Sequence, residues 1–187
     1  MSLLFPDFFD KGRVVAFGQT PFDVSALTGR VTVVLPGDYV RYAVVPWSDA
    51  LAGDAEEERY VRHHFIRVYG ERAKGWTLRA SPAAAGEARL CSAVDAPVVE
   101  SIRAAFQGKK AKLVSIQPAL MTAFNRARSS IPREGAWLVL AEAGRACVAL
   151  YAGGWRSVLN ARGAWQDLLA RERHRAEGRI PEKVINL

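Results

Sequence analysis

The stretch that decides the fold is GAWLVLAEAGRACVALYAGGWRSVLNARG, residues Gly135–Gly163. Apolar residues alternate with other residues along three segments of it, which is the pattern of half-buried β-strands. Gly144 separates the first segment from the second, and Gly153 with Gly154 separates the second from the third, where tight turns need positive φ. We therefore predict three antiparallel strands joined by two tight turns, with Glu142 at the end of the first strand.

Strands and helices alternate along the rest of the chain. The expected strands are Arg13–Phe17, Val31–Leu35, Tyr39–Val45, Trp76–Ala80, Ala88–Val94 and Lys112–Ile116. The expected helices are Asp49–Tyr69, a segment from Asp95 to Gly108, a segment containing Leu120, Met121 and Phe124, and Ala164–Glu177. Because Pro36, Gly37 and Asp38 are typical turn residues, we expect the strands on either side of them to pair as a hairpin. This order predicts a layered α/β or α+β architecture.

Composition indicates a folded protein that needs no disulfide or bound metal for its stability. The chain has 187 residues, of which 50% are apolar and 24% charged, and a chain of this length buries roughly 70% of its unfolded surface. No apolar run is long enough to cross a bilayer, and the first residues lack a basic signal-peptide region, so we expect a cytoplasmic protein. Cys91 and Cys147 lie in apolar strands and are expected to be buried free thiols, although the sequence leaves a disulfide open.

The chain is basic, with 26 Lys and Arg against 19 Asp and Glu and a formal charge of +7. This charge fits two explanations: binding to nucleic acid or an anionic membrane, or an arginine-rich composition without a dedicated partner. We favour the second, because Arg greatly outnumbers Lys. The last quarter nevertheless concentrates cations, at Arg162, Arg171, Arg173, Arg175, Arg179 and Lys183.

Common catalytic motifs are absent from the sequence. It has no phosphate-binding Gly-rich loop ending in Lys-Ser or Lys-Thr, no GxSxG, no CxxC and no HExxH. Among the acids Glu142 is unusual, because it ends an apolar strand beside a glycine turn, although an exposed hairpin carboxylate would look the same. The five tryptophans lie mostly at strand and helix positions, which favours core or interface roles over stacking on bases.

The order of several strings resembles the PilM-like pilus assembly proteins and the cytoplasmic part of GspL-type secretion proteins. The resemblance begins with VTVVLPGDYVRYAVVPW, continues through the long helix, RLCSAVDA and KLVSIQPALMTAFNR, and ends with the three-strand segment. It covers Val31–Gly163. The resemblance implies an actin-like, ribonuclease H-like fold, truncated relative to full actin-like ATPases. It also implies an N-terminal segment (1–30), a first lobe (31–117) and a second lobe (118–187).

Nucleotide-using members of that family hold ATP with two Asp-x-Gly turns and a later adenosine lobe. This sequence has GQTPF after its first strand and, in the second place, only Glu142-Ala143-Gly144. Magnesium-phosphate binding needs several oxygens placed together. We therefore expect no cofactor and no enzymatic activity, with Glu142 and Gly144 as the remnant of a phosphate turn.

The leading hypothesis is a non-catalytic scaffold or adaptor of a type IV pilus or type II secretion-like assembly. The implied partners are other assembly proteins, inner-membrane components and a second copy of the chain, at a cytoplasmic location that includes the periphery of the inner membrane. Trp165, Arg171 and Arg173 are the candidate partner-binding residues. Two alternatives stay open: residual ATP binding through Glu142 and Gly144, and nucleic-acid binding centred on Arg171, Arg173 and Arg175.

Overall fold

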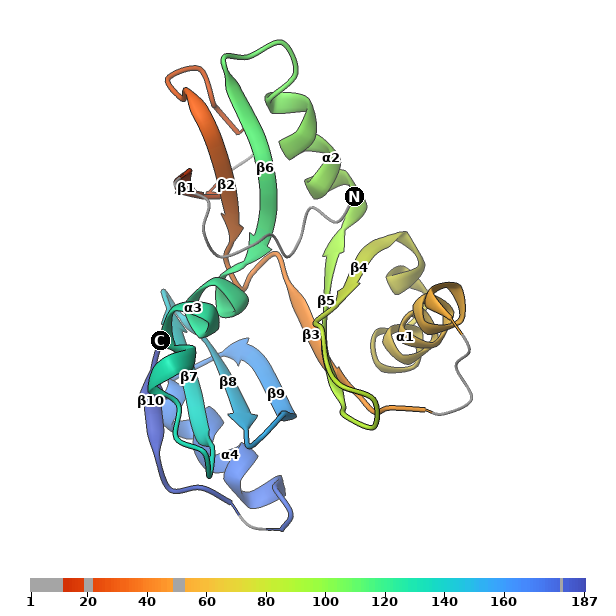
Figure 1. Cartoon of the computed structure of the whole chain (residues 1–187), viewed down its shortest axis with the longest axis vertical. Helices are drawn as coiled ribbons and strands as arrows, with labels where there is room; N and C mark the ends of the chain where they lie inside the picture. Colours follow the sequence, from red (N-terminus) through yellow and green to blue (C-terminus); the bar gives the residue numbers. More distant parts are fainter. Residues whose placement is uncertain (1–11, 19–21, 49–52, 179) are drawn as a thin grey trace.

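The computed structural model describes residues 12–18, 22–48, 53–178 and 180–187. Three sheets form the frame of three lobes, here called A, B and C (Figure 1). Lobe A is uppermost in Figure 1, lobe B lies to its lower right, and lobe C lies below. The largest core cluster draws residues from all three sheets, so the lobes share one continuous apolar interior.

Lobe A holds a parallel sheet in the order β1-β2-β6. Its elements are β1 (Arg13–Ala16), β2 (Gly29–Leu35), β6 (Ala111–Pro118), α2 (Ala96–Ala105) and α3 (Ala119–Ala127). Strand β2 is central, and its Val31, Val33 and Leu35 are fully buried. These three residues alternate along the strand and so lie on one face of it, while Thr32 and Val34 on the other face are partly buried. Residues of α2 and α3 join the same core.

The predicted hairpin of β2 with the next strand is wrong. The turn itself forms, since the Tyr39 N–H donates to the Pro36 carbonyl at 3.0 Å. However, both edges of β2 are already paired, with β1 on one side and β6 on the other. The chain after the turn therefore leaves this sheet and starts lobe B. The Pro36–Tyr39 turn is a connection between two lobes.

Lobe B is an antiparallel sheet in the order β3-β5-β4, covered by one long helix. Its elements are β3 (Arg41–Val45), α1 (Asp54–Tyr69), the 3₁₀ turn η1 (Glu71–Gly75), β4 (Trp76–Ala80) and β5 (Arg89–Asp95). The predicted antiparallel pairing of β4 with β5 is confirmed. Phe65 of α1 and Trp76 of β4 pack together in the core of this lobe. The predicted helix start at Asp49 lies outside the described residues.

Lobe C contains the three-strand segment that opened the sequence analysis. Its elements are β7 (Ala136–Glu142), β8 (Arg145–Tyr151), β9 (Trp155–Arg162), α4 (Trp165–Arg175) and β10 (Val184–Asn186). The antiparallel pairings β7-β8 and β8-β9 confirm the prediction. Gly144 and Gly153 have positive φ as predicted, whereas Gly154 does not. Strand β10, which is three residues long and pairs parallel to β7, was not predicted from the sequence.

The alternation along β7 and β8 sends side chains to two different cores. Leu138, Cys147 and Ala149 point into the core shared with lobes A and B. Trp137, Val139 and Val148 point to the opposite face, where Leu168 and Leu169 of α4 cover them. None of the described helices is long and apolar enough to span a membrane.

Candidate functional site at the junction of the lobes

Three polar side chains of lobe C lie on the face of its sheet that is turned toward lobes A and B. Glu142 follows Leu138 with the two-residue period of a strand, so it shares that face. Arg145 is the register partner of Glu142, and Asn160 is the register partner of Cys147. The pleat and the register therefore place a carboxylate, a guanidinium and an amide together at one end of the sheet.

All three side chains bind the Pro36–Tyr39 turn or the residue after it. The backbone N–H of Gly37 donates to Glu142 Oε2 at 2.8 Å. Asn160 Nδ2 donates to the carbonyls of Gly37 and Val40, at 2.9 and 3.0 Å. Arg145 Nε donates to Asp38 Oδ1 at 2.8 Å, and Arg145 Nη1 donates to Asn160 Oδ1 at 3.1 Å. We call this set of contacts the junction.

Gly37 is buried in close contact with these side chains. A Cβ built on Gly37 would lie 2.5 Å from Glu142 Oε2 and 3.0 Å from Arg145 Cδ. Such distances are shorter than van der Waals contact, so only glycine fits here without movement. The Pro36–Tyr39 turn therefore packs directly against the side chains of the lobe C sheet, with no room for a further methyl group.

The junction lies beside the apolar core. The side chain of Arg145 is 15% exposed, whereas that of its partner Asp38 is 61% exposed and faces solvent. The pKa of the Cys147 thiol is raised well above its usual value, mainly by burial and further by the negative charge of Glu142, while Arg145 opposes the shift. The ion pair is thus partly shielded from water, which makes its hydrogen bonds stronger than those of a fully solvated pair.

The junction does not fit a magnesium ion with a nucleotide phosphate. Such a site needs several free oxygen ligands close together. Here Glu142 Oε2 accepts from a backbone N–H, and Asp38 pairs with Arg145. Among the residues that the structure describes, no three His, Cys, Asp or Glu side chains are placed to hold a metal. The contacts are those of a joint between lobes.

The other predicted site residues lie on the far side of the lobe C sheet. Trp165 is half-buried and packs against the core under α4, which makes it largely structural. Arg173 is exposed, and its Nη2 donates to the carbonyl of Glu182 at 3.1 Å, which holds the segment before β10. Arg171 is exposed on α4. The structure therefore groups Glu142 with Gly144 and keeps Arg171 and Arg173 away from them.

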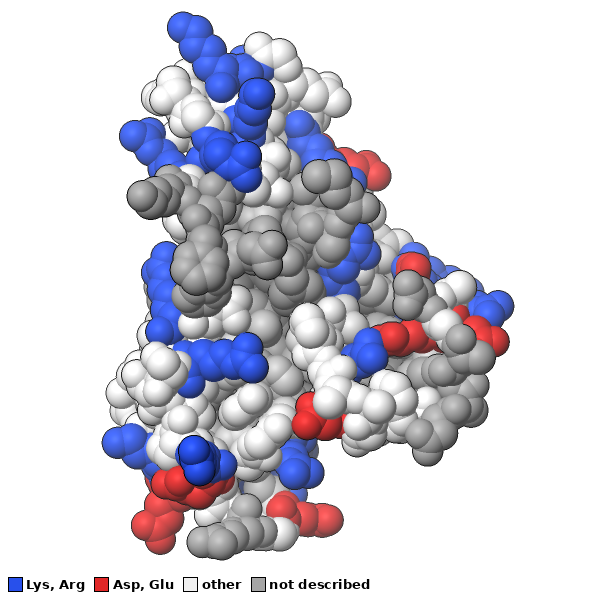
Figure 2. All heavy atoms as spheres, in the orientation of Figure 1, with Lys and Arg blue, Asp and Glu red and all other residues white. Residues whose placement is uncertain are grey.

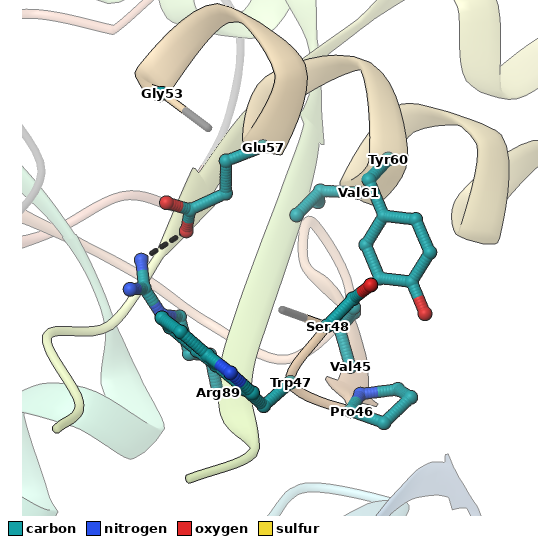
Figure 3. Close-up of a pocket in the computed structure, with 9 residues that line it drawn as sticks. All are labelled: Val45, Pro46, Trp47, Ser48, Gly53, Glu57, Tyr60, Val61 and Arg89. Carbon is teal, nitrogen blue, oxygen red and sulfur yellow. Dashed lines mark hydrogen bonds and ion pairs between the residues drawn. The ribbon is translucent and has the colours of Figure 1, made fainter. Parts of the chain in front are cut away.

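A small cavity of about 100 Å³ lies in lobe B, between α1 and the end of β3 (Figure 3). Arg89 pairs with Glu57 there, and its guanidinium lies 5.5 Å from the ring centroid of Trp47. Both charged side chains are about three-quarters buried. Burial raises the pKa of the nearby Cys91 thiol to about 12, with a further rise from Glu57 and an opposing effect of Arg89. These residues form a charged anchor between α1 and β5.

The tryptophans and cysteines lie mostly in the core, as predicted. Trp76, Trp137 and Trp155 are buried, which leaves no open face on them for a nucleic-acid base. Cys91 and Cys147 are buried and free.

Three residues of the junction were not predicted as site residues from the sequence: Gly37, Arg145 and Asn160. Arg145 and Asn160 could have been found by extending the strand alternation from Glu142 to the neighbouring strands, because that alternation assigns all of them to one face. The role of Gly37 could not have been found in this way. It depends on a contact between segments far apart in the sequence.

Comparison with known proteins places the fold. No protein-family model and no curated protein sequence matches the chain. The structure is similar to the cytoplasmic domain of EpsL, an inner-membrane component of the type II secretion system of Vibrio cholerae, with a TM-score of 0.55 and 14% identity. That match covers 84% of this chain and 62% of the EpsL domain.

A second similar structure is a chain of the PilM-PilN type IV pilus biogenesis complex, with a TM-score of 0.55 and 17% identity. It covers 78% of this chain and 47% of the other. The chain thus spans about half to three-fifths of the length of these two proteins. The predicted resemblance to PilM-like and GspL-like proteins is confirmed at the level of the fold: the chain shares the α/β fold of these two structures.

Proposed function

We propose that the protein is a non-catalytic scaffold or adaptor of a bacterial envelope assembly of the type IV pilus or type II secretion class. The junction carries this proposal. In the place where the family resemblance leads us to expect a phosphate turn, Glu142 accepts a hydrogen bond from the backbone of another lobe. One oxygen of this carboxylate is thus used to stabilise the arrangement of the lobes, which supports a structural role for Glu142.

The fold supports the class of assembly. The two similar structures described above are a cytoplasmic domain of a secretion component and a pilus biogenesis complex. Fold alone does not determine function. The proposal therefore rests on two observations. The fold supports the class of envelope assembly, and the structural use of Glu142 at the junction supports a role without catalysis.

The outer face of α4 is the proposed partner surface. It carries the exposed Arg171, together with Arg175, which pairs with Glu172 at 3.7 Å. Arg171 is the residue to test, because Trp165 and Arg173 also support the fold. Arg162, which is exposed at the end of β9 in the same lobe, provides a matched control.

Affinity capture from the native host after cross-linking tests the scaffold role. We expect the wild-type protein and Arg162→Glu to recover identified pilus or secretion components, and Arg171→Glu to recover them in strongly reduced amounts. Recovery of nucleic acid without any envelope protein would overturn the proposal. Equal recovery by the Arg171→Glu and Arg162→Glu variants would show that the partner surface does not lie on α4.

Calorimetry with ATP and magnesium tests the non-catalytic character. We expect no heat of binding from the wild-type protein. Micromolar binding that Glu142→Ala abolishes would replace the proposal with a nucleotide-binding function at this turn. Glu58→Ala, which removes an exposed acid of α1 far from the junction, controls for the loss of one negative charge.

A further inference from the structure

Cations gather at one end of lobe A. Because its three strands are parallel, they all begin at this end: Arg13 is the first residue of β1, and Lys112 is the second residue of β6. Arg30, the second residue of β2, is the register partner of Lys112. Figure 2 shows blue side chains over this upper end of the molecule.

The turn that leads from α2 into β6 adds further cations. Arg103 lies in the last turn of α2, and Lys109 and Lys110 follow in the turn. We call Arg13, Arg103, Lys109, Lys110 and Lys112 the basic tip. All five are exposed, and none of them forms an ion pair with another residue that the structure describes.

The acidic groups that the structure describes near the tip do not neutralise it. The pKa of the Asp23 carboxyl is lowered mainly by hydrogen bonds from Ser25, and the positive charge of Lys109 makes a smaller contribution. Glu100 lies three residues before Arg103 on α2 without an ion pair to it. The tip therefore keeps a net positive charge.

The kind of cation indicates the kind of partner. The chain has six lysines and twenty arginines, yet three of the six lysines fall within residues 109–112. Lysine is a compact, strongly hydrated point charge, whereas arginine is favoured for bidentate binding of single phosphates. A lysine-rich surface suits diffuse attraction to many anionic groups in one plane.

We propose that the basic tip docks on the anionic surface of a lipid bilayer. This rests on the proposed function, an adaptor of a bacterial envelope assembly. In Figure 1 the tip is the convex upper end of lobe A, and α4 lies at the opposite end of the molecule, so both surfaces can be occupied together. Val14, which follows Arg13, is 49% exposed and adds an apolar side chain at this end.

Nucleic acid fits the tip less well. The nearby aromatic side chains, Phe17, Phe22 and Phe106, pack against one another, and Phe17 and Phe106 are buried. Single-strand binding uses exposed rings on which bases stack. Duplex reading uses a whole helix or ribbon that enters a groove. Among the described residues the tip presents strand starts, a turn and only the last turn of a helix.

Vesicle co-sedimentation tests the proposal. We compare vesicles of phosphatidylcholine alone with vesicles that also contain phosphatidylglycerol, at low and high salt. The test variant is Lys109→Gln/Lys110→Gln/Lys112→Gln. The control variant is Arg133→Gln/Arg156→Gln/Arg162→Gln, which removes three exposed cations from lobe C and its entry loop. Both lower the formal charge from +7 to +4, that is 26 − 3 − 19.

We expect the wild-type protein to bind only the anionic vesicles and to be released by high salt. The tip variant should lose affinity on the order of a hundredfold, and the control less than about threefold. Equal losses in the two variants, no vesicle binding at low salt, or displacement from vesicles by an equal concentration of duplex DNA phosphate would overturn the proposal. Thermal unfolding of each variant verifies that it is folded. Partner capture in detergent, without a bilayer, tests the proposed function independently.

Discussion

Two glycine turns adjoin the junction, and their glycines are needed for different reasons. Gly37, in the turn between β2 and β3, is surrounded: a Cβ there would lie 2.5 Å from Glu142 Oε2. Gly144, in the turn between β7 and β8, has a φ of +71° and nothing within 4 Å of a Cβ. One position is restricted by its neighbours, and the other only by its own backbone.

This difference shows which of the two turns is fitted to its neighbours in the other lobe. The β7-β8 turn is an ordinary tight connection that any hairpin of this length requires. The Gly37 turn is shaped to the Glu142, Arg145 and Asn160 side chains that it touches. The family resemblance pointed to Gly144 as the informative glycine, but the contacts between lobes are concentrated at Gly37.

The largest expected effect comes from Gly37→Ala. The new methyl group would displace the Glu142 carboxylate or the turn itself, and either movement weakens the hydrogen bonds that Glu142 and Asn160 make with the turn. We expect a loss of about 3 kcal/mol in the free energy of unfolding, because one of these bonds involves a charged group. Urea denaturation measures it.

A double-mutant cycle with Glu142→Ala isolates the cause of that loss. Removing the carboxylate takes away the atom nearest to the new methyl group, so Gly37→Ala should cost less than half as much in the Glu142→Ala background. The remaining cost reflects Arg145 Cδ and Asn160 Oδ1, at 3.0 and 3.1 Å from the built Cβ. An unchanged cost would mean that the methyl group does not act through Glu142.

The second effect concerns Glu142 itself. Glu142→Ala leaves the N–H of the buried Gly37 without its acceptor, and we expect a loss of about 2 kcal/mol in the free energy of unfolding. Glu142→Gln should lose less than half of that, because the amide oxygen can still accept the hydrogen bond. Denaturation of the two variants side by side checks the order. If Gln is as costly as Ala, charge rather than hydrogen bonding is what Glu142 supplies.

Much of the fold could be predicted from the sequence because local patterns determine much of it. The alternation along residues 136–162 and the glycine at 144 specified the β7-β8-β9 sheet. The hairpin predicted at Pro36 failed because turn residues specify a change of direction, whereas strand pairing depends on which edges are free. In this protein β1 and β6, both distant in sequence, occupy the two edges of β2.

The junction could be predicted only in part, for the same reason. The unusual position of Glu142 was visible in the sequence, and strand alternation assigns Arg145 and Asn160 to its face. What these side chains bind depends on a loop that belongs to another lobe, more than 100 residues away for Glu142. No periodicity carries that information. The basic tip likewise needed the parallel arrangement that brings three strand starts to one end.

The third effect uses Cys147 to report opening of the junction. This thiol lies on the face of β8 that carries Arg145, and its pKa is raised mainly by burial and further by Glu142. Because the thiolate is the reactive species, labelling requires local opening of the structure. In a Cys91→Ala background we expect Gly37→Ala to speed the labelling of Cys147 about tenfold.

Cys91 supplies the control for that measurement. It is buried in lobe B, where burial raises its pKa to about 12. In a Cys147→Ala background its labelling rate should change much less when Gly37 is replaced. If both thiols accelerate equally, labelling proceeds through global unfolding and not through selective opening of the junction.

The smallest effect is expected at Gly144. An alanine there must adopt a left-handed backbone conformation, which costs roughly 1 kcal/mol, but its methyl group meets no neighbour. Asparagine tolerates this conformation better than alanine, so Gly144→Asn should be less destabilising than Gly144→Ala. Urea denaturation of the two variants measures the order. If the asparagine variant loses as much as Gly37→Ala, then the Gly144 turn also contacts a specific neighbour, and the distinction between the two turns fails.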